Sequence, residues 1–171
     1  MASLDNSNRG KASPQGCIKI NVGTGWSGET ATGFGMVACS SSGEFLFAAS
    51  SLEPQRKAPQ IAEASAMRWC LMVAQELEFD TIVVESNAAG VINALTSPRC
   101  PPDIAPIIKD CIGLTTHFSV ISFCHVKRKA NGVAHARSSI ACDFQVWCGG
   151  MIHLFVFVLP KHSQGVTYLG Y

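Results

Sequence analysis

Hydrophobic and polar residues alternate in the first part of the chain, as they do in half-buried strands. Cys17 to Val22 follow this period of two, and the runs Thr32 to Cys39 and Glu44 to Ser50 have the same character. Glycine-rich turns are expected between the first two runs, and Ser41-Ser42-Gly43 supplies turn residues between the second and third. Three strands joined by short turns predict an antiparallel meander.

The apolar period changes after Pro59. From Gln60 to Leu77 apolar residues cover most of a helix circumference, which predicts a central packing helix, and proline suits its first turn. Thr81 to Glu85 is short, apolar and β-branched, as in a buried strand. A short helix, Ala88 to Leu95, is expected next.

The last part of the pattern predicts a helix, a strand and a final helix. Asp103 is expected to cap a helix that runs to about Thr116, with Pro106 in its first turn. Val120 to Cys124 follows as a strand and Ala130 to Ala141 as a helix. The order βββαβααβα predicts an α/β fold. Its mixed five-stranded sheet has three antiparallel and then two parallel strands, with helices flanking it.

Composition and charge fit one folded domain without a strong field. The chain has 171 residues, 13 basic and 12 acidic side chains, and 47% hydrophobic residues. Nucleic-acid binding therefore requires a local basic patch. We divide the chain into a disordered leader at 1–16, a folded domain at 17–143 and an apolar extension at 144–171.

The extension contains Met151 to Leu159, which is apolar except for His153. It is expected to pack on the core or to mediate self-association, and it is too short to span a membrane. The eight cysteines are scattered without metal-site spacing, so a reducing compartment, cytoplasm or nucleus, is expected.

Four short stretches carry a family resemblance: Ile20 to Gly25, Ala62 to Ala66, Val83 to Asn87 and Asn131 to His135. In this order and spacing they resemble the plant-type ribonuclease H-like family, which occurs alone and in retroelement polyproteins. The resemblance runs from about Cys17 to about Ala141. It implies acids from the first strand, the central helix, the fourth strand and the last helix that hold two divalent cations for hydrolysis of RNA–DNA hybrids.

Two of the implied metal ligands are replaced in this chain. Gly23 stands where the family has an aspartate and offers no side-chain ligand; its alternative role is a turn or strand end. Asn87 replaces a second aspartate; its amide oxygen is uncharged, and it is expected to cap the following helix. Glu63 matches the retained helix acid, although a first-turn glutamate also complements the helix dipole. Glu85 is the nearby acid that would compensate.

Two histidines complete the resemblance, and cations surround one of them. His135 matches the last-helix ligand, and His125 matches a mobile histidine that assists proton transfer. Lys127, Arg128, Lys129 and Arg137 form the expected phosphate-binding patch. The alternative is an ordinary solvated loop.

Three functions stay open on these observations. The first is a ribonuclease H-like domain that binds an RNA–DNA hybrid or duplex RNA weakly but has lost hydrolysis. The second is an active Mg²⁺- or Mn²⁺-dependent hybrid ribonuclease, for which a hard-oxygen ligand set is required. The third is a non-catalytic interaction domain or a retroelement remnant.

Overall fold

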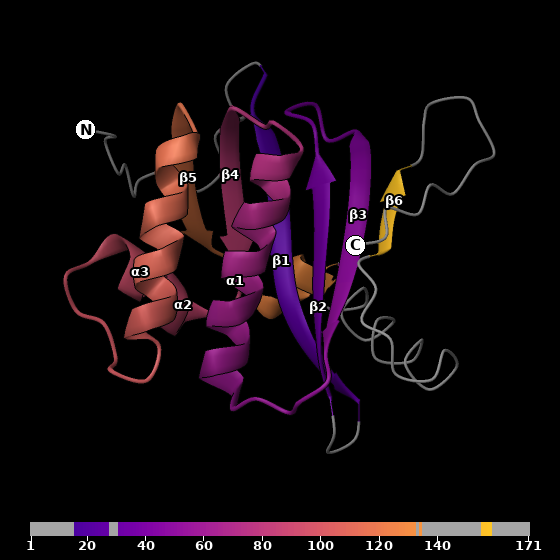
Figure 1. The fold of residues 1–171 in the computed structure, drawn as a ribbon. Helices are drawn as coiled ribbons and strands as arrows, with labels where there is room; N and C mark the ends of the chain where they lie inside the picture. Colours follow the sequence, from indigo (N-terminus) through magenta and orange to yellow (C-terminus); the bar gives the residue numbers. More distant parts are fainter. Residues whose placement is uncertain (1–15, 28–30, 133, 135–154, 159–171) are drawn as a thin grey trace.

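A computed structural model describes residues 16–27, 31–132, 134 and 155–158, and its centre is a six-stranded sheet in the order β5-β4-β1-β2-β3-β6 (Figure 1). The strands are β1 (Ile18–Ser27), β2 (Ala31–Cys39), β3 (Phe45–Glu53), β4 (Thr81–Ser86), β5 (Val120–His125) and β6 (Phe155–Val158). β1, β2 and β3 pair antiparallel, and β4 and β5 extend the sheet in parallel with β1, as predicted. The predicted sheet lacked β6, which pairs antiparallel with the outer edge of β3.

The helices are α1 (Pro59–Glu76), α2 (Ala89–Thr96) and α3 (Ala105–Leu114), with 3₁₀ turns η1 (Thr115–His117) and η2 (Arg128–Asn131). α1 and α3 lie against each other across one face of the sheet, and η2 lies behind it (Figure 1). The predicted α/β class is confirmed. Beyond η2, Gly132 and Ala134 are helical, and the rest of the predicted final helix lies outside the described residues, as does nearly all of the leader.

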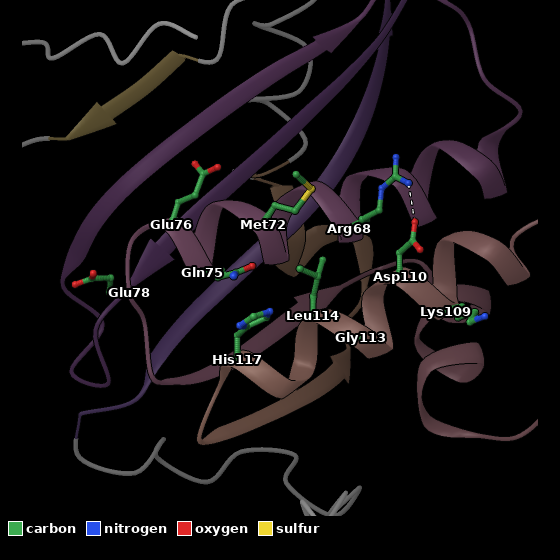
Figure 2. Close-up of a pocket in the computed structure, with 10 residues that line it drawn as sticks. All are labelled: Arg68, Met72, Gln75, Glu76, Glu78, Lys109, Asp110, Gly113, Leu114 and His117. Carbon is green, nitrogen blue, oxygen red and sulfur yellow. Dashed lines mark hydrogen bonds and ion pairs between the residues drawn. The ribbon is translucent and has the colours of Figure 1, made fainter.

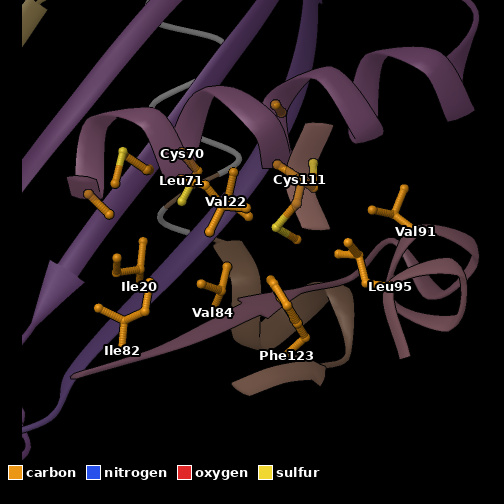
Figure 3. Close-up of a cluster of buried hydrophobic side chains, with 14 of the residues drawn as sticks. Ile20, Val22, Cys70, Leu71, Ile82, Val84, Val91, Leu95, Cys111 and Phe123 are labelled. Atoms are coloured by element: carbon orange, nitrogen blue, oxygen red, sulfur yellow. The ribbon is translucent and has the colours of Figure 1, made fainter. Parts of the chain in front are cut away.

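The core fills the space between the sheet and α1. Alternate residues of the strands, among them Ile20 and Val22 of β1 and Val84 of β4, point toward Leu71 of α1 (Figure 3). Phe34 of β2 contacts Trp69 of α1 with ring centroids 6.1 Å apart. Since period-two alternation places every second strand residue on this face, the core follows directly from the sequence pattern.

β1 is longer than predicted because its glycines continue the strand. Gly23 pairs with Gly35, and Gly25 pairs with Gly33, within the antiparallel ladder of β1 and β2. The expectation of a turn or strand end at Gly23 and Gly25 was therefore wrong. The ladder pairs their backbone groups, so β1 continues to Ser27.

The start of α3 also differs from the prediction. Its N-cap residue is Ile104, and no side chain caps the helix, so Asp103 does not have the expected role. The N–H groups of Ile104 and Ala105 donate to the carbonyls of Pro101 and Pro102, at 3.2 and 3.3 Å. A backbone turn thus leads into the helix and replaces the side-chain cap. Pro106 does lie in the first turn.

A threonine fixes the loop before α1. The Thr32 hydroxyl donates to the carbonyl of Gln55 at 2.9 Å and accepts from the N–H of Lys57 at 3.0 Å. Pro59 then opens the helix, as predicted. Two hydrogen bonds to β2 therefore set where α1 begins and where its first turns lie against the sheet.

Within the described residues, none of the helices combines the length and apolarity that crossing a bilayer requires.

Candidate functional site

The candidate ligand positions of β1 and β4 lie at the same end of the sheet. The two strands are parallel, with Asn21 opposite Glu85. Gly23 and Asn87 each lie two residues further along, and residues two apart on a strand share a face. The fold therefore brings together the two positions at which the resemblance implies aspartates.

Asn131 of η2 joins these two strand ends. Its Nδ2 donates to the backbone carbonyl of Val22 and to Oδ1 of Asn87, both at 2.8 Å, and its side chain is 1% exposed. This buried amide was missed by the sequence analysis, which considered only His135 in that stretch. The sequence signal that could have identified it is a single asparagine in a segment that ends among apolar residues. An amide that is buried in such a segment requires hydrogen-bond partners.

Asn87 consequently has a different role from the predicted one. The N-cap residue of α2 is Ala88, and no side chain caps the helix conventionally. The Ser86 hydroxyl instead accepts a hydrogen bond from the N–H of Ala88 at 3.2 Å. The prediction that Asn87 caps α2 was wrong because its side-chain oxygen is bonded to Asn131.

Glu63 is the retained carboxylate, on the second turn of α1. It is not in the first turn, so the predicted interaction with the helix dipole was wrong. Burial raises the pKa of its carboxyl above the ordinary value, and the guanidinium of Arg128 partly offsets that rise. Glu63 of α1 and Arg128 of η2 therefore interact at this end of the sheet, and burial makes ionisation of the Glu63 carboxyl less favourable than in water.

This pKa shift predicts a pH-dependent stability. Because the folded state binds the Glu63 proton more tightly than the unfolded chain, stability falls as pH rises from 4.5 through the folded pKa. Glu63→Gln removes this cost, so the variant should be more stable than the unaltered chain at pH 7 and should lose that advantage below pH 4.5. Urea unfolding across this range measures the difference. Glu76→Gln, at the exposed end of the same helix, is the matched control; an equal gain there, or none at Glu63, contradicts the prediction.

Glu85 has its own partners within the protein. Its Oε2 accepts a hydrogen bond from Nδ2 of Asn21 at 2.9 Å and lies 4.0 Å from Nζ of Lys19. Burial and the charge of Glu85 both raise the pKa of the Cys124 thiol, which lies opposite Glu85 on β5. Asn21 and Glu85 lie two residues before Gly23 and Asn87 on their strands. The contacts with Asn21 and Lys19 already occupy the Glu85 carboxylate.

Exposed basic residues lie at the end of β5 and directly after it. His125, Lys127, Arg128 and Lys129 are all exposed, and we call these residues the basic loop. The N–H of Val126 donates to the carbonyl of Ser86 at 2.9 Å, which holds the loop against the end of β4. Lys57, in the loop before α1, is not part of the basic loop: its ammonium pairs with Glu53 and lies 3.4 Å from the Ser65 hydroxyl. His135 and Arg137 lie outside the described residues.

The described residues do not fit the implied pair of cations. No group of three or more His, Cys, Asp or Glu side chains in that part of the chain could hold a metal ion. Gly23 has no donor, and the Asn87 oxygen accepts from Asn131. The remaining oxygen of Asn131 is buried and finds no hydrogen-bond partner among the described residues, but it carries no charge. Divalent cations of this type require several anionic oxygens, and Glu63 alone supplies one.

A separate open groove lies between α1 and α3, away from these residues. Figure 2 shows Arg68 and Asp110 on its two walls, joined by an ion pair at 3.0 Å. Its lining carries both signs of charge and includes Met72 and His117. None of the predicted site residues that the structure describes lines it, so we assign the groove no part in the site.

A family whose description is reverse transcriptase-like matches residues 21–141, which is more than half of the chain. The chain belongs to this reverse transcriptase-like family. The match covers the site positions from Asn21 onward and stops before β6. No curated protein matches this chain.

Solved structures show that the reverse transcriptase-like domain has the ribonuclease H fold. RNase H1 of the archaeon Halobacterium salinarum is 24% identical, with a TM-score of 0.68 over 75% of this chain and 98% of that one. The N-terminal RNase H domain of a Mycobacterium tuberculosis protein is 18% identical, with a TM-score of 0.66 over 78% and 99%. LC11-RNase H1 from compost, solved with an RNA/DNA hybrid, is 18% identical, with a TM-score of 0.66 over 75% and 99%.

Proposed function

We propose that this domain binds RNA–DNA hybrids through the basic loop and has lost the two-cation hydrolysis that the family resemblance implies. The observation that carries the proposal is the Asn131 bridge: Nδ2 of Asn131 bonds to Asn87 where an aspartate would face a cation. Gly23, at the other replaced position, has no side chain that could bind a cation. The domain keeps the ribonuclease H fold, on which a duplex would bind. It lacks the carboxylates that would hold two cations.

The basic loop supports the binding half of the proposal. Three adjacent cations, Lys127, Arg128 and Lys129, are exposed beside the ends of β4 and β5. Such a cluster neutralises phosphates irrespective of base sequence, so binding should weaken as salt rises. The complex of LC11-RNase H1 with an RNA/DNA hybrid makes a hybrid the first ligand to test.

Replacing Lys127 and Lys129 together by alanine should weaken hybrid binding. Each lost phosphate contact lowers the slope of log K against log salt by about 1, so the double variant should lose about 2 from the slope. Fluorescence anisotropy with a labelled hybrid, repeated at several salt concentrations, measures this. Lys109→Ala, an exposed lysine on α3, is the matched control.

Two outcomes would reject the proposal. The unaltered chain would show no hybrid binding at low salt, or it would cleave the hybrid with Mg²⁺ or Mn²⁺ in a reaction that Glu63→Gln abolishes. The second result would instead identify an active ribonuclease. Parallel titrations with duplex RNA and duplex DNA show whether the domain prefers the hybrid.

A further inference from the structure

β6 gives this chain a sheet edge that lies outside the family match. The match ends at residue 141, whereas β6 covers Phe155–Val158. β6 pairs with β3 in the register Phe47 to Val158 and Ser50 to Phe155. Figure 1 shows it at the end of the sheet beside β3. Among the described residues, no strand pairs with its outer edge.

Apart from its short length, this edge lacks the features that natural sheets use to prevent pairing. Edge strands are usually interrupted by lysine, proline or a bulge, because their unpaired N–H and C=O groups otherwise recruit another strand. β6 is Phe-Val-Phe-Val, and the apolar run around it, 151–159, has no acidic or basic residue except His153 and no proline. Alternating aromatic and β-branched residues also have high strand propensity.

The sequence of β6 is self-complementary. In an antiparallel pair of two β6 strands related by a two-fold axis, opposite residues lie on the same face of the sheet, so Phe155 lies opposite Phe157 of the other copy and Val156 lies opposite its own copy. The cross-strand pairs are then aromatic against aromatic on one face and β-branched against β-branched on the other, with no like charges opposed, and aromatic pairs stabilise antiparallel strands. The same patch meets itself, as a two-fold dimer requires.

We propose that two copies of this chain associate edge to edge through β6, so that their sheets become continuous. The interface is short, so the dimer is weak and depends on protein concentration. It lies at the opposite end of the sheet order from β5 and the basic loop. Two basic loops are then presented by one particle, which raises avidity for a long duplex.

Sedimentation velocity of the full chain over a range of concentrations tests the dimer. Proline scanning identifies the edge, because neighbouring residues of a strand direct their N–H groups to opposite sides. Of Val156→Pro and Phe157→Pro, one removes a bond to β3 and the other removes a donor from the outer edge.

We expect one of these two variants to be monomeric at all concentrations while its thermal unfolding midpoint matches that of the unaltered chain. The other should unfold at a lower temperature. A monomeric unaltered chain at the highest concentration, or a dimer that persists in both variants, would overturn the proposal. Hybrid binding to a short duplex, measured on the same samples, should be equal in the monomeric variant, so failure here is separable from failure of the proposed function.

Discussion

Gly23→Asp combined with Asn87→Asp should create cleavage of RNA–DNA hybrids in the presence of Mg²⁺ or Mn²⁺. The two positions lie at the same end of adjacent parallel strands, and Glu63 lies on the neighbouring helix. Loss of a group that only orients a ligand costs roughly 10- to 100-fold, so restoring two ligands should raise the rate at least about 100-fold above that of the unaltered chain. A labelled hybrid resolved on a denaturing gel measures the rate.

The control for this experiment is the same double variant with Glu63→Gln added. It should fold but remain inactive, because it lacks the acid that α1 supplies. Gly23 is buried, so circular dichroism must first show that the aspartate is accommodated. If the folded double variant remains inert, the site differs from that of active relatives in more than these ligands, and the proposed reason for lost activity is wrong.

Leu71→Ala should lower the free energy of unfolding by about 3 kcal/mol, the scale measured for leucines truncated in packed cores. Leu71 lies on α1 at 0% exposure, within the cluster between the helix and the sheet. Removing its branched end leaves a cavity that the surrounding β1 and β4 residues cannot fill, since sheet and helix are already in contact. Urea unfolding at equilibrium measures the change.

The neighbouring residue provides a matched control. Met72 is 46% exposed on the same helix, so Met72→Ala removes a side chain of similar size without opening a core cavity. Its effect should stay within about 0.5 kcal/mol. Equal destabilisation by the two substitutions would contradict the packing of Leu71 against the sheet, because alanine has the higher helix propensity in both cases and only the loss of packing separates them.

The fold was predictable where one physical rule decided the outcome. Period-two alternation identified the first strands, and the all-round apolar helix after Pro59 identified α1. The predictions failed where a tertiary partner replaced a local preference. Glycine weakens the interior of a strand and often marks a bulge or bend, but Gly23 and Gly25 pair with Gly35 and Gly33 on β2. The sequence of one strand alone does not determine which residues it pairs with across a hairpin.

The candidate site was predictable in its positions but not in its contacts. The family resemblance located Gly23, Glu63 and Asn87, and the structure brings the strand positions together. It did not reveal that Asn87 is bonded to Asn131, more than forty residues later in the chain. Asparagine before a helix favours capping locally, and only the three-dimensional arrangement shows the stronger competitor.

The hydrogen bond from Asn131 to Asn87 bears on what an acid at residue 87 would require of its surroundings. An N–H that donates to the oxygen of an asparagine donates equally well to the oxygen of an aspartate, so reversion at residue 87 requires no rearrangement of its neighbour. Residue 87 can therefore vary between amide and carboxylate while the hydrogen bond that ties η2 to the end of β4 is kept.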